Sequence, residues 1–226
     1  MTIQEGSAGL RLHRSKYPRT YHLPWSESKT SDDKTFSQEE TDKIFKGKKI
    51  VVTEKLDGEN TTIYSDGYCH ARSIDSKDHE SRSYVKSLAA KISHQIPENW
   101  RLLGENLYAK HSIEYDGLPD YFILFGIVDN NENSLSWSNV EEYAKLLDLH
   151  TAPVLYSGIY DEDLVKSLKH KTSSFGKEIE GYVLRTSDSF PINEFGKNVA
   201  KFVRKNHVQT DQHWMFSKIT PNKIRK

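Results

Sequence analysis

One lysine in this sequence stands where covalent chemistry would be possible. Residues 51–60 read VVTEKLDGEN, so Lys55 ends an apolar, β-branched run that predicts a strand. Gly58 follows and lets the backbone turn tightly or approach a ligand closely. Residues 61–63 predict a second strand, so the stretch reads as strand, turn, strand. A lone lysine in such a turn is more often a surface charge, and a catalytic role needs partners elsewhere in the chain.

Charged residues at the ends of other predicted strands could be those partners. They are Arg72, Glu105, Glu180, Arg185 and Lys201. With Lys55 they offer a nucleophile, cations for phosphate groups, and carboxylates for a ribose or a divalent ion. The sequence contains no G-x-x-x-x-G-K-S/T loop, no G-x-G-x-x-G and no H-E-x-x-H. Its single cysteine, Cys69, excludes a zinc site built on paired cysteines.

A lysine nucleophile must lose its proton before it attacks. The ordinary lysine pKa lies near 10.4, so fewer than about 1 in 1000 lysines are uncharged at pH 7. Lowering that pKa to about 7–8 is worth about 4 kcal/mol, which neighbouring cations and partial burial can provide. We expect Arg185, Lys201 and a divalent ion to lower the pKa of Lys55 in this way.

The lysine stretch and several other short motifs together resemble a known family. EKLDGEN at residues 54–60 is similar to the K-x-D/H-G-x-N nucleotidyl motif of ATP-dependent RNA ligases. The other motifs follow in the family's order: ARS at 71–73, GE at 104–105, the apolar strand at 121–127, EGYVLR at 180–185 and AKFVR at 200–204. The chain as a whole resembles the RNA ligase 2-like branch of the covalent nucleotidyltransferases.

The resemblance implies a reaction in three steps. Lys55 would attack the α-phosphate of ATP and form lysyl-AMP, AMP would pass to a 5′-phosphate end, and a 3′-hydroxyl would attack that end and release AMP. The nucleotide-binding residues that the family motifs imply are Glu54, Lys55, Asn60, Arg72, Glu105, Phe125, Glu180, Arg185 and Lys201.

The resemblance also implies roles for the residues around the nucleotide. Phe125 would stack on adenine, Glu105 would bind the ribose, and Arg72 would contact a phosphate or the ribose. Arg185 and Lys201 would offset charge on the α-phosphate.

Two carboxylates are implied as metal ligands. Glu180 would position Mg²⁺ or Mn²⁺ through water, and Asp57 is the second candidate ligand. The implied substrates are ATP and RNA, and the implied context is RNA repair. The sequence leaves open whether the RNA is a nicked duplex, an RNA/DNA hybrid, a broken tRNA loop or free single strands.

Two departures from the family pattern stand out. Gly126 follows Phe125 where relatives often have aspartate, and the last motif contains one lysine, Lys201, where relatives have two. Arg204 and Lys205 are the candidates to replace the missing lysine.

Three other functions remain open on the sequence alone. A DNA ligase or a capping-type guanylyltransferase would share the lysine chemistry, but those families usually carry arginine where this chain has Asn60. They also need an appended barrel domain. An inactive nucleic-acid-binding scaffold would not need the intact lysine motif.

Composition limits the class and the compartment of the protein. The formal net charge is zero over 226 residues, so a nucleic acid must be bound by a local basic patch. No apolar run is long enough to cross a membrane. With only Cys69, no internal disulfide is possible, and we expect a reducing, cytoplasmic location.

We expect an α+β fold: a nucleotidyltransferase domain of the ATP-grasp-like ligase adenylation type, with mainly antiparallel sheets and flanking helices. Capping boxes at Ser37 and Ser138 predict helices over 37–45 and 138–147, and apolar spacing predicts two more at 85–96 and 164–168. Residues 1–226 would form a single adenylyltransferase domain without a separate oligonucleotide-binding fold. The basic C-terminal tail, 206–226, would bind polynucleotide through Lys218, Lys223, Arg225 and Lys226, with His207, His213 and Trp214 nearby.

Overall fold

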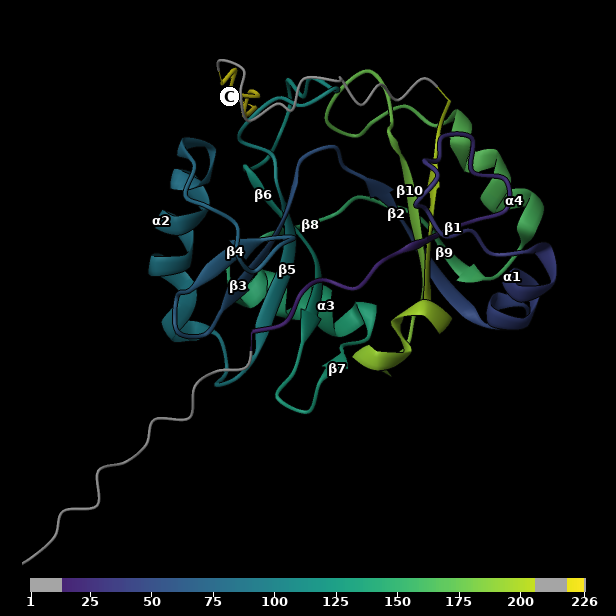
Figure 1. The fold of residues 1–226 in the computed structure, drawn as a ribbon, viewed down its shortest axis with the longest axis horizontal. Coiled ribbons are helices and arrows are strands. Elements are labelled where there is room, and N and C mark those ends of the chain that lie inside the picture. Colours follow the sequence, from purple (N-terminus) through teal and green to yellow (C-terminus); the bar gives the residue numbers. More distant parts are fainter. Residues whose placement is uncertain (1–13, 206–218, 226) are drawn as a thin grey trace, which may run out of the picture.

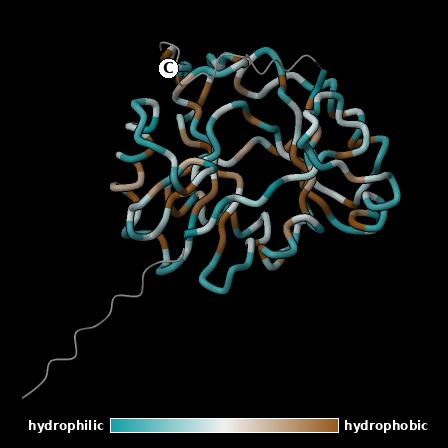
Figure 2. Tube along the Cα trace, viewed as in Figure 1, coloured by the Kyte–Doolittle hydropathy of each residue, from teal (hydrophilic) through white to brown (hydrophobic). Residues whose placement is uncertain are grey.

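Two β-sheets face each other in this protein, and residues of both line the cleft between them (Figure 1). The computed structural model describes residues 14–205 and 219–225. Figure 2 shows hydrophobic residues mainly in the inner segments of the chain and hydrophilic residues mainly along its outer segments. The mixed α+β class with mainly antiparallel sheets is confirmed.

The first sheet has five strands in the order β1-β12-β10-β2-β9. Their bounds are Tyr21–His22 (β1), Val199–Val203 (β12), Gly181–Thr186 (β10), Lys49–Lys55 (β2) and Val154–Ile159 (β9). Neighbours are antiparallel except β1 and β12, which are parallel. The register places Lys55 opposite Gly181 and Val183 opposite Lys201, so three of the predicted motifs meet on adjacent strands.

The second sheet has the order β11-β7-β6-β5-β3-β4, and β8 pairs with β6. The bounds are Phe190–Pro191 (β11), Asn133–Ser134 (β7), Phe122–Val128 (β6), Arg101–Asn106 (β5), Glu59–Tyr64 (β3), Cys69–Ala71 (β4) and His150–Thr151 (β8). Only β6 and β8 pair in parallel among these described strands. Asn60 lies opposite Glu105 in this sheet.

Helices cover the outer faces of the sheets (Figure 1). α1 (Gln38–Phe45) and α4 (Glu162–Ser167) share a core with the first sheet, and α2 (Ser83–Ile92) and α3 (Trp137–Leu146) share a core with the second. Short 3₁₀ helices span Glu80–Arg82, Ser93–Gln95, Leu168–His170 and Ile192–Lys197. No helix in the described part of the chain has the length and apolar character needed to cross a membrane.

The alternation of side chains along β2 explains why Lys55 faces the cleft. Ile50 and Val52 pack into the core under α1 and α4, while Val51 packs into the core of the second sheet. Because alternate residues point to opposite faces, Lys55 shares the side of Val51, and Glu54 points the other way.

Residues 56–58 connect β2 in the first sheet to β3 in the second. β2 and β3 therefore do not pair with each other. The strand, turn, strand pattern of residues 51–63 would also fit a β-hairpin, in which the two strands do pair. A Cβ on Gly58 would lie 2.6 Å from the Asn106 carbonyl oxygen and 2.7 Å from a Leu107 methyl group, so only glycine fits this crossing. The crossing places Lys55 and the charges of β3 and β5 in the same cleft.

The four predicted helices are present, α2 and α4 begin two residues earlier than predicted, and one of the two predicted capping boxes is wrong. The Ser37 capping box is confirmed, with reciprocal hydrogen bonds between Ser37 and Glu40. The capping box at Ser138 is wrong, because α3 begins at Trp137 and Ser136 accepts the N–H of Asn139. Burial of the Trp137 ring draws the helix start back by two residues.

Candidate active site

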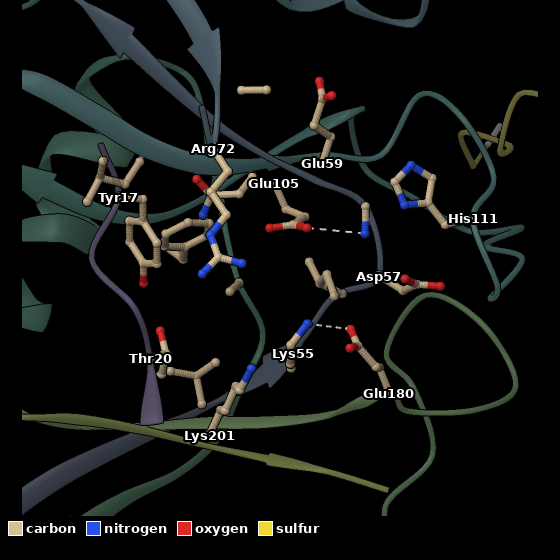
Figure 3. Close-up of a pocket in the computed structure, with 18 of the residues that line it drawn as sticks. Tyr17, Thr20, Lys55, Asp57, Glu59, Arg72, Glu105, His111, Glu180 and Lys201 are labelled. Atoms are coloured by element: carbon tan, nitrogen blue, oxygen red, sulfur yellow. Dashed lines mark hydrogen bonds and ion pairs between the residues drawn. The ribbon is translucent and has the colours of Figure 1, made fainter. Parts of the chain in front are cut away.

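All of the predicted site residues line one cavity of about 1550 Å³ between the two sheets. They are Glu54, Lys55, Asp57, Asn60, Arg72, Glu105, Phe125, Glu180, Arg185 and Lys201. Figure 3 shows Lys55, Arg72, Glu105 and Lys201 pointing into the same space. Residues from distant parts of the sequence therefore meet in this cavity. No single motif in the sequence could have predicted that they lie together.

Lys55 and Glu180 form the ion pair at the centre of the cavity. Lys55 Nζ lies 2.6 Å from Glu180 Oε2, and the side chains are 25% and 6% exposed. The pair follows from the register of β2 and β10, since Glu180 directly precedes Gly181, the residue opposite Lys55.

The pKa of Lys55 differs from the sequence-based expectation. Burial lowers that pKa, but the nearby carboxylates of Glu180, Glu105 and Asp57 more than offset burial and leave it above the ordinary lysine value. We expected Arg185 and Lys201 to lower it. Carboxylates rather than cations surround the amine, so Lys55 is a charged ammonium in this structure. It can lose its proton once another cation binds these carboxylates and neutralises their charge.

Glu105 lies across the cavity from Lys55 as a carboxyl group that titrates near neutrality. Burial raises its pKa to about 8, Lys55 opposes this, and the charges of Glu180 and Asp57 add to it. One oxygen accepts the N–H of Gly58 at 3.2 Å. At neutral pH most of this group is protonated, so it can both donate and accept hydrogen bonds.

Asp57 is held by two bonds from the loop of residues 107–118. Its backbone N–H donates to Tyr115 Oη at 2.8 Å, and its Oδ2 accepts the N–H of Ile113, also at 2.8 Å. Asp57 is only 8% exposed. The turn that follows Lys55 is thus fixed from outside the motif itself.

Lys201 is paired with a residue that the sequence analysis did not single out. Its Nζ lies 3.7 Å from Asp33 Oδ1, and Asp33 also lies 3.4 Å from His22 Nε2. Burial would raise the pKa of Asp33, but hydrogen bonds from Thr30 and the charge of Lys201 lower it to about 2. Burial lowers the pKa of Lys201 itself, with Lys55 and Arg72 acting in the same direction and Asp33 against it.

The far end of the cavity is aromatic. The Tyr17 ring meets the edge of Phe125 with centroids 5.6 Å apart, and it also contacts Phe195 at 5.3 Å. Residues 14–20 bring Tyr17 there by crossing from the second sheet to β1 (Figure 1). No periodic pattern in the sequence marks Tyr17, because this segment is extended and irregular.

Arg185 lies at this aromatic end and is not brought next to Lys55. It is four residues along β10 from Gly181, or about 13 Å at strand spacing. Its guanidinium donates to the carbonyls of Leu135 at 2.6 Å and Thr186 at 3.1 Å, so its hydrogen bonds go largely to the protein backbone. The position suits the base end of a nucleotide better than its α-phosphate.

Glu54 and Asn60 differ in how far they are already engaged. The Glu54 carboxylate accepts Ser173 Oγ at 2.6 Å and the N–H of Ser174 at 2.9 Å, on the face of β2 away from Lys55. The buried Oδ1 of Asn60 has no hydrogen-bond partner among the described residues. Asn60 therefore has an acceptor available for a ligand in the cavity.

The carboxylates fit a hydrated divalent ion better than a closed protein cage. Within residues 14–205 and 219–225, no three histidine, cysteine or carboxylate side chains are grouped as a metal site. Magnesium usually keeps several waters and takes one or two carboxylates together with phosphate oxygens. Glu180 and Asp57, both close enough to Lys55 to raise its pKa, match that donor set.

The basic tail is described only in part. His207, His213, Trp214, Lys218 and Lys226 lie outside the described residues. Residues 219–225 pack against the body instead of extending from it, with backbone bridges between Ala109 and Pro221 and between Leu118 and Ile224. Lys223 and Arg225 are exposed on this segment, whereas Asn222 is 2% exposed.

Comparisons with known proteins agree with this architecture. A sequence model described as RNA ligase matches residues 48–203. No curated protein matches the sequence.

Several solved structures of an RNA ligase from Naegleria gruberi are similar to this protein. An apo variant aligns with a TM-score of 0.54 and 18% identity over 84% of this chain and 61% of that one, and a variant with ATP and Mn gives the same values. A variant with AMP and Mn gives a TM-score of 0.52 and 19% identity over 84% and 62%. At this identity the likeness establishes a shared fold, and this chain spans about three fifths of the length of those ligase chains.

Proposed function

Because this chain belongs to the RNA ligase family, we propose that it is an ATP-dependent RNA ligase that joins 5′-phosphate and 3′-hydroxyl ends through lysyl-AMP on Lys55. The observation that carries the proposal is the Lys55–Glu180 pair, 2.6 Å apart in a cavity lined by every candidate nucleotide-binding residue. A lysine that points into the cavity, with cations further along it, suits attack on a phosphate once the lysine has lost its proton.

Each cavity residue then has a task that its surroundings permit. Phe125 and Tyr17 hold the adenine, and Arg185 contacts the base end from beside them. Glu105, mostly protonated at neutral pH, binds a ribose hydroxyl. Lys201, aligned by Asp33, offsets charge on the α-phosphate.

Proton loss from Lys55 is the step that these residues must control. As the bond from Lys55 Nζ to Glu180 breaks, the ammonium loses a proton to water. The neutral amine attacks the α-phosphorus, the bond to the β-phosphate oxygen breaks, and pyrophosphate leaves with that oxygen. A second proton is lost from the nitrogen as the phosphoramidate forms. Glu180 and Asp57 are the residues that would hold Mg²⁺ or Mn²⁺, and the bound ion would stabilise charge on the phosphates. The Naegleria structures with ATP or AMP and Mn support the same substrate and ion here.

The polynucleotide ends would approach from the mouth of the cleft. A shallow hollow there is lined by Lys16, Tyr17, Arg19, Arg72 and Ser73, three of which are cations. Such a group suits the phosphates of an RNA strand. We propose nicked duplex RNA or an RNA/DNA hybrid as the substrate, in RNA repair, and a reducing cytoplasmic location consistent with the free Cys69.

Labelled ATP tests the proposal on the whole chain. We expect the protein to retain label from α-³²P-ATP with Mg²⁺ or Mn²⁺ on a denaturing gel, and to seal a 5′-phosphate nick with release of AMP. A panel of nicked RNA, nicked hybrid, nicked DNA and single strands ranks the substrates. Sealing of nicked DNA alone, or labelling by GTP instead of ATP, would replace the proposal with a DNA ligase or a capping-type enzyme.

A further inference from the structure

The segment of residues 219–225, here called the C-terminal clip, is built into the fold through one buried side chain. Asn222 Oδ1 accepts the N–H of Tyr115 at 2.9 Å, and its Nδ2 donates to the carbonyl of Leu107 at 2.8 Å. These two partners lie on opposite limbs of the loop of residues 107–118. Asn222 therefore links the two limbs of that loop to each other.

Backbone bonds hold the clip between the same two limbs. The N–H of Lys110 donates to the carbonyl of Thr220 at 2.8 Å, and the N–H of Asn222 donates to the carbonyl of Tyr108 at 2.9 Å. On the other limb, the N–H of Lys223 donates to the carbonyl of Tyr115 at 2.9 Å. The clip thus satisfies backbone groups on both sides, as a short inserted strand would.

The loop in turn fixes the turn next to the nucleophile. Tyr115, which is fully buried, accepts the N–H of Asp57 at its hydroxyl, and the N–H of Ile113 binds the Asp57 carboxylate. Asp57 is two residues from Lys55. Tyr115 therefore connects Asn222, which binds its backbone N–H, to Asp57, which binds its hydroxyl.

We propose that Asn222 is a positioning residue for lysyl-AMP formation, acting through Tyr115 on Asp57 and the turn after Lys55. This inference rests on the proposed function. It adds a second role to the C-terminal tail, for which the sequence predicts polynucleotide binding.

Asparagine is suited to this task because its amide supplies one donor side and one acceptor side. The variant Asn222→Asp keeps an acceptor for the N–H of Tyr115 but has no donor for the carbonyl of Leu107. Alanine could do neither, and would leave buried backbone groups without partners. The series from asparagine through aspartate to alanine is therefore a graded test.

The rate of lysyl-AMP formation in a single turnover is the readout. With ATP saturating, and well below each variant's unfolding temperature, we expect Asn222→Ala to be slower by about tenfold or more, because small misplacements of reacting groups have effects of this size. Asn222→Asp should fall between, and the ATP concentration for half-maximal rate should change by less than about threefold, because no nucleotide contact is removed. Ile224→Ala, which removes a side chain 40% exposed on the same clip, is the matched control and should react as wild type does.

A double-mutant comparison separates positioning from general stability. Tyr115→Phe removes the hydroxyl that binds Asp57 and keeps the ring in the core, so it should slow the reaction as well. If Asn222 acts through Tyr115, adding Asn222→Asp to Tyr115→Phe should cause little further loss.

Two results would overturn the inference. One is a wild-type rate of lysyl-AMP formation in folded Asn222→Asp and Asn222→Ala. The other is that Asn222→Asp and Tyr115→Phe lower only the unfolding temperature, and that their effects on it add fully in the double variant. A wild-type protein that takes no label from ATP would instead reject the proposed function. If Asn222→Ala does not fold, the comparison of Asn222→Asp with Tyr115→Phe decides the question alone.

Discussion

Replacing Glu180 with glutamine should change the reactivity of Lys55 in two opposite directions. The substitution removes the charge 2.6 Å from Lys55 Nζ and keeps the shape of the side chain. An opposite charge this close typically shifts a pKa by about 1–3 units, and each unit is a tenfold change in the uncharged amine. Burial already lowers the pKa of Lys55. Without Glu180, we expect about 10- to 1000-fold more uncharged Lys55 at pH 8.

Two assays on the same variant measure the two directions. Limited acetylation across a pH series, read for the Lys55 peptide by mass spectrometry, should show faster modification and a lower apparent pKa in Glu180→Gln. Lysyl-AMP formation from ATP should be slower by about 10²–10³, the usual effect of losing one electrostatic contact in a site. Glu178→Gln is the matched control, because Glu178 is two residues away, 65% exposed and paired with Arg204.

Each assay has its own result that would contradict the prediction for Glu180→Gln. An unchanged titration of Lys55 in Glu180→Gln would mean that the ion pair does not set the charge state of the nucleophile. A wild-type rate with ATP would mean that Glu180 does not take part in nucleotide transfer. A change of equal size in Glu178→Gln would attribute both effects to the net charge of the protein.

Two further predictions concern the groups around the nucleotide. Lys201→Ala should raise the barrier to lysyl-AMP formation by about 2–4 kcal/mol. Asp33→Asn should slow the reaction less, and Arg204→Ala least, as measured by single-turnover rates. Equal losses for Lys201→Ala and Arg204→Ala would mean that the last motif is aligned in the wrong register. Because the pKa of Glu105 is raised to about 8, the protonated form holds below that pH, so apparent ATP affinity should weaken as pH rises through 8 and stay level in Glu105→Gln. Because the pKa of Glu105 is raised to about 8, the free energy of unfolding should fall as pH rises from the ordinary carboxyl range to 8. Glu105→Gln should remove this fall, as measured by thermal unfolding across pH. Parallel pH curves for the two proteins would contradict the assignment.

The sequence was informative wherever side-chain chemistry coincides with strand periodicity. Lys55, Glu105 and Lys201 lie on strands that apolar runs predict, and the resemblance to a known family implied that the three share a nucleotide site. Helix boundaries followed in the same way from Ser37, where a side-chain cap decides the start. At Ser138 the pattern was present but burial of Trp137 determined the boundary.

What could not be predicted depends on contacts between segments far apart in sequence. The pairing of Asp33 with Lys201, and of Asn222 with Tyr115, arises from irregular segments that have no periodic pattern. The raised pKa of Lys55 is another case, since it depends on three carboxylates brought together by two sheets. β9 is a half-exposed edge strand without clear alternation, so no periodic pattern in the sequence marks it.

The most direct test of the account is to locate the bond between protein and nucleotide. After reaction with ATP and Mg²⁺ or Mn²⁺, we predict one AMP per chain, acid-labile, on the peptide that contains Lys55, and none in a folded Lys55→Ala protein that still binds RNA. AMP on another residue, or label retained by Lys55→Ala, would contradict the central claim that Lys55 is the nucleophile.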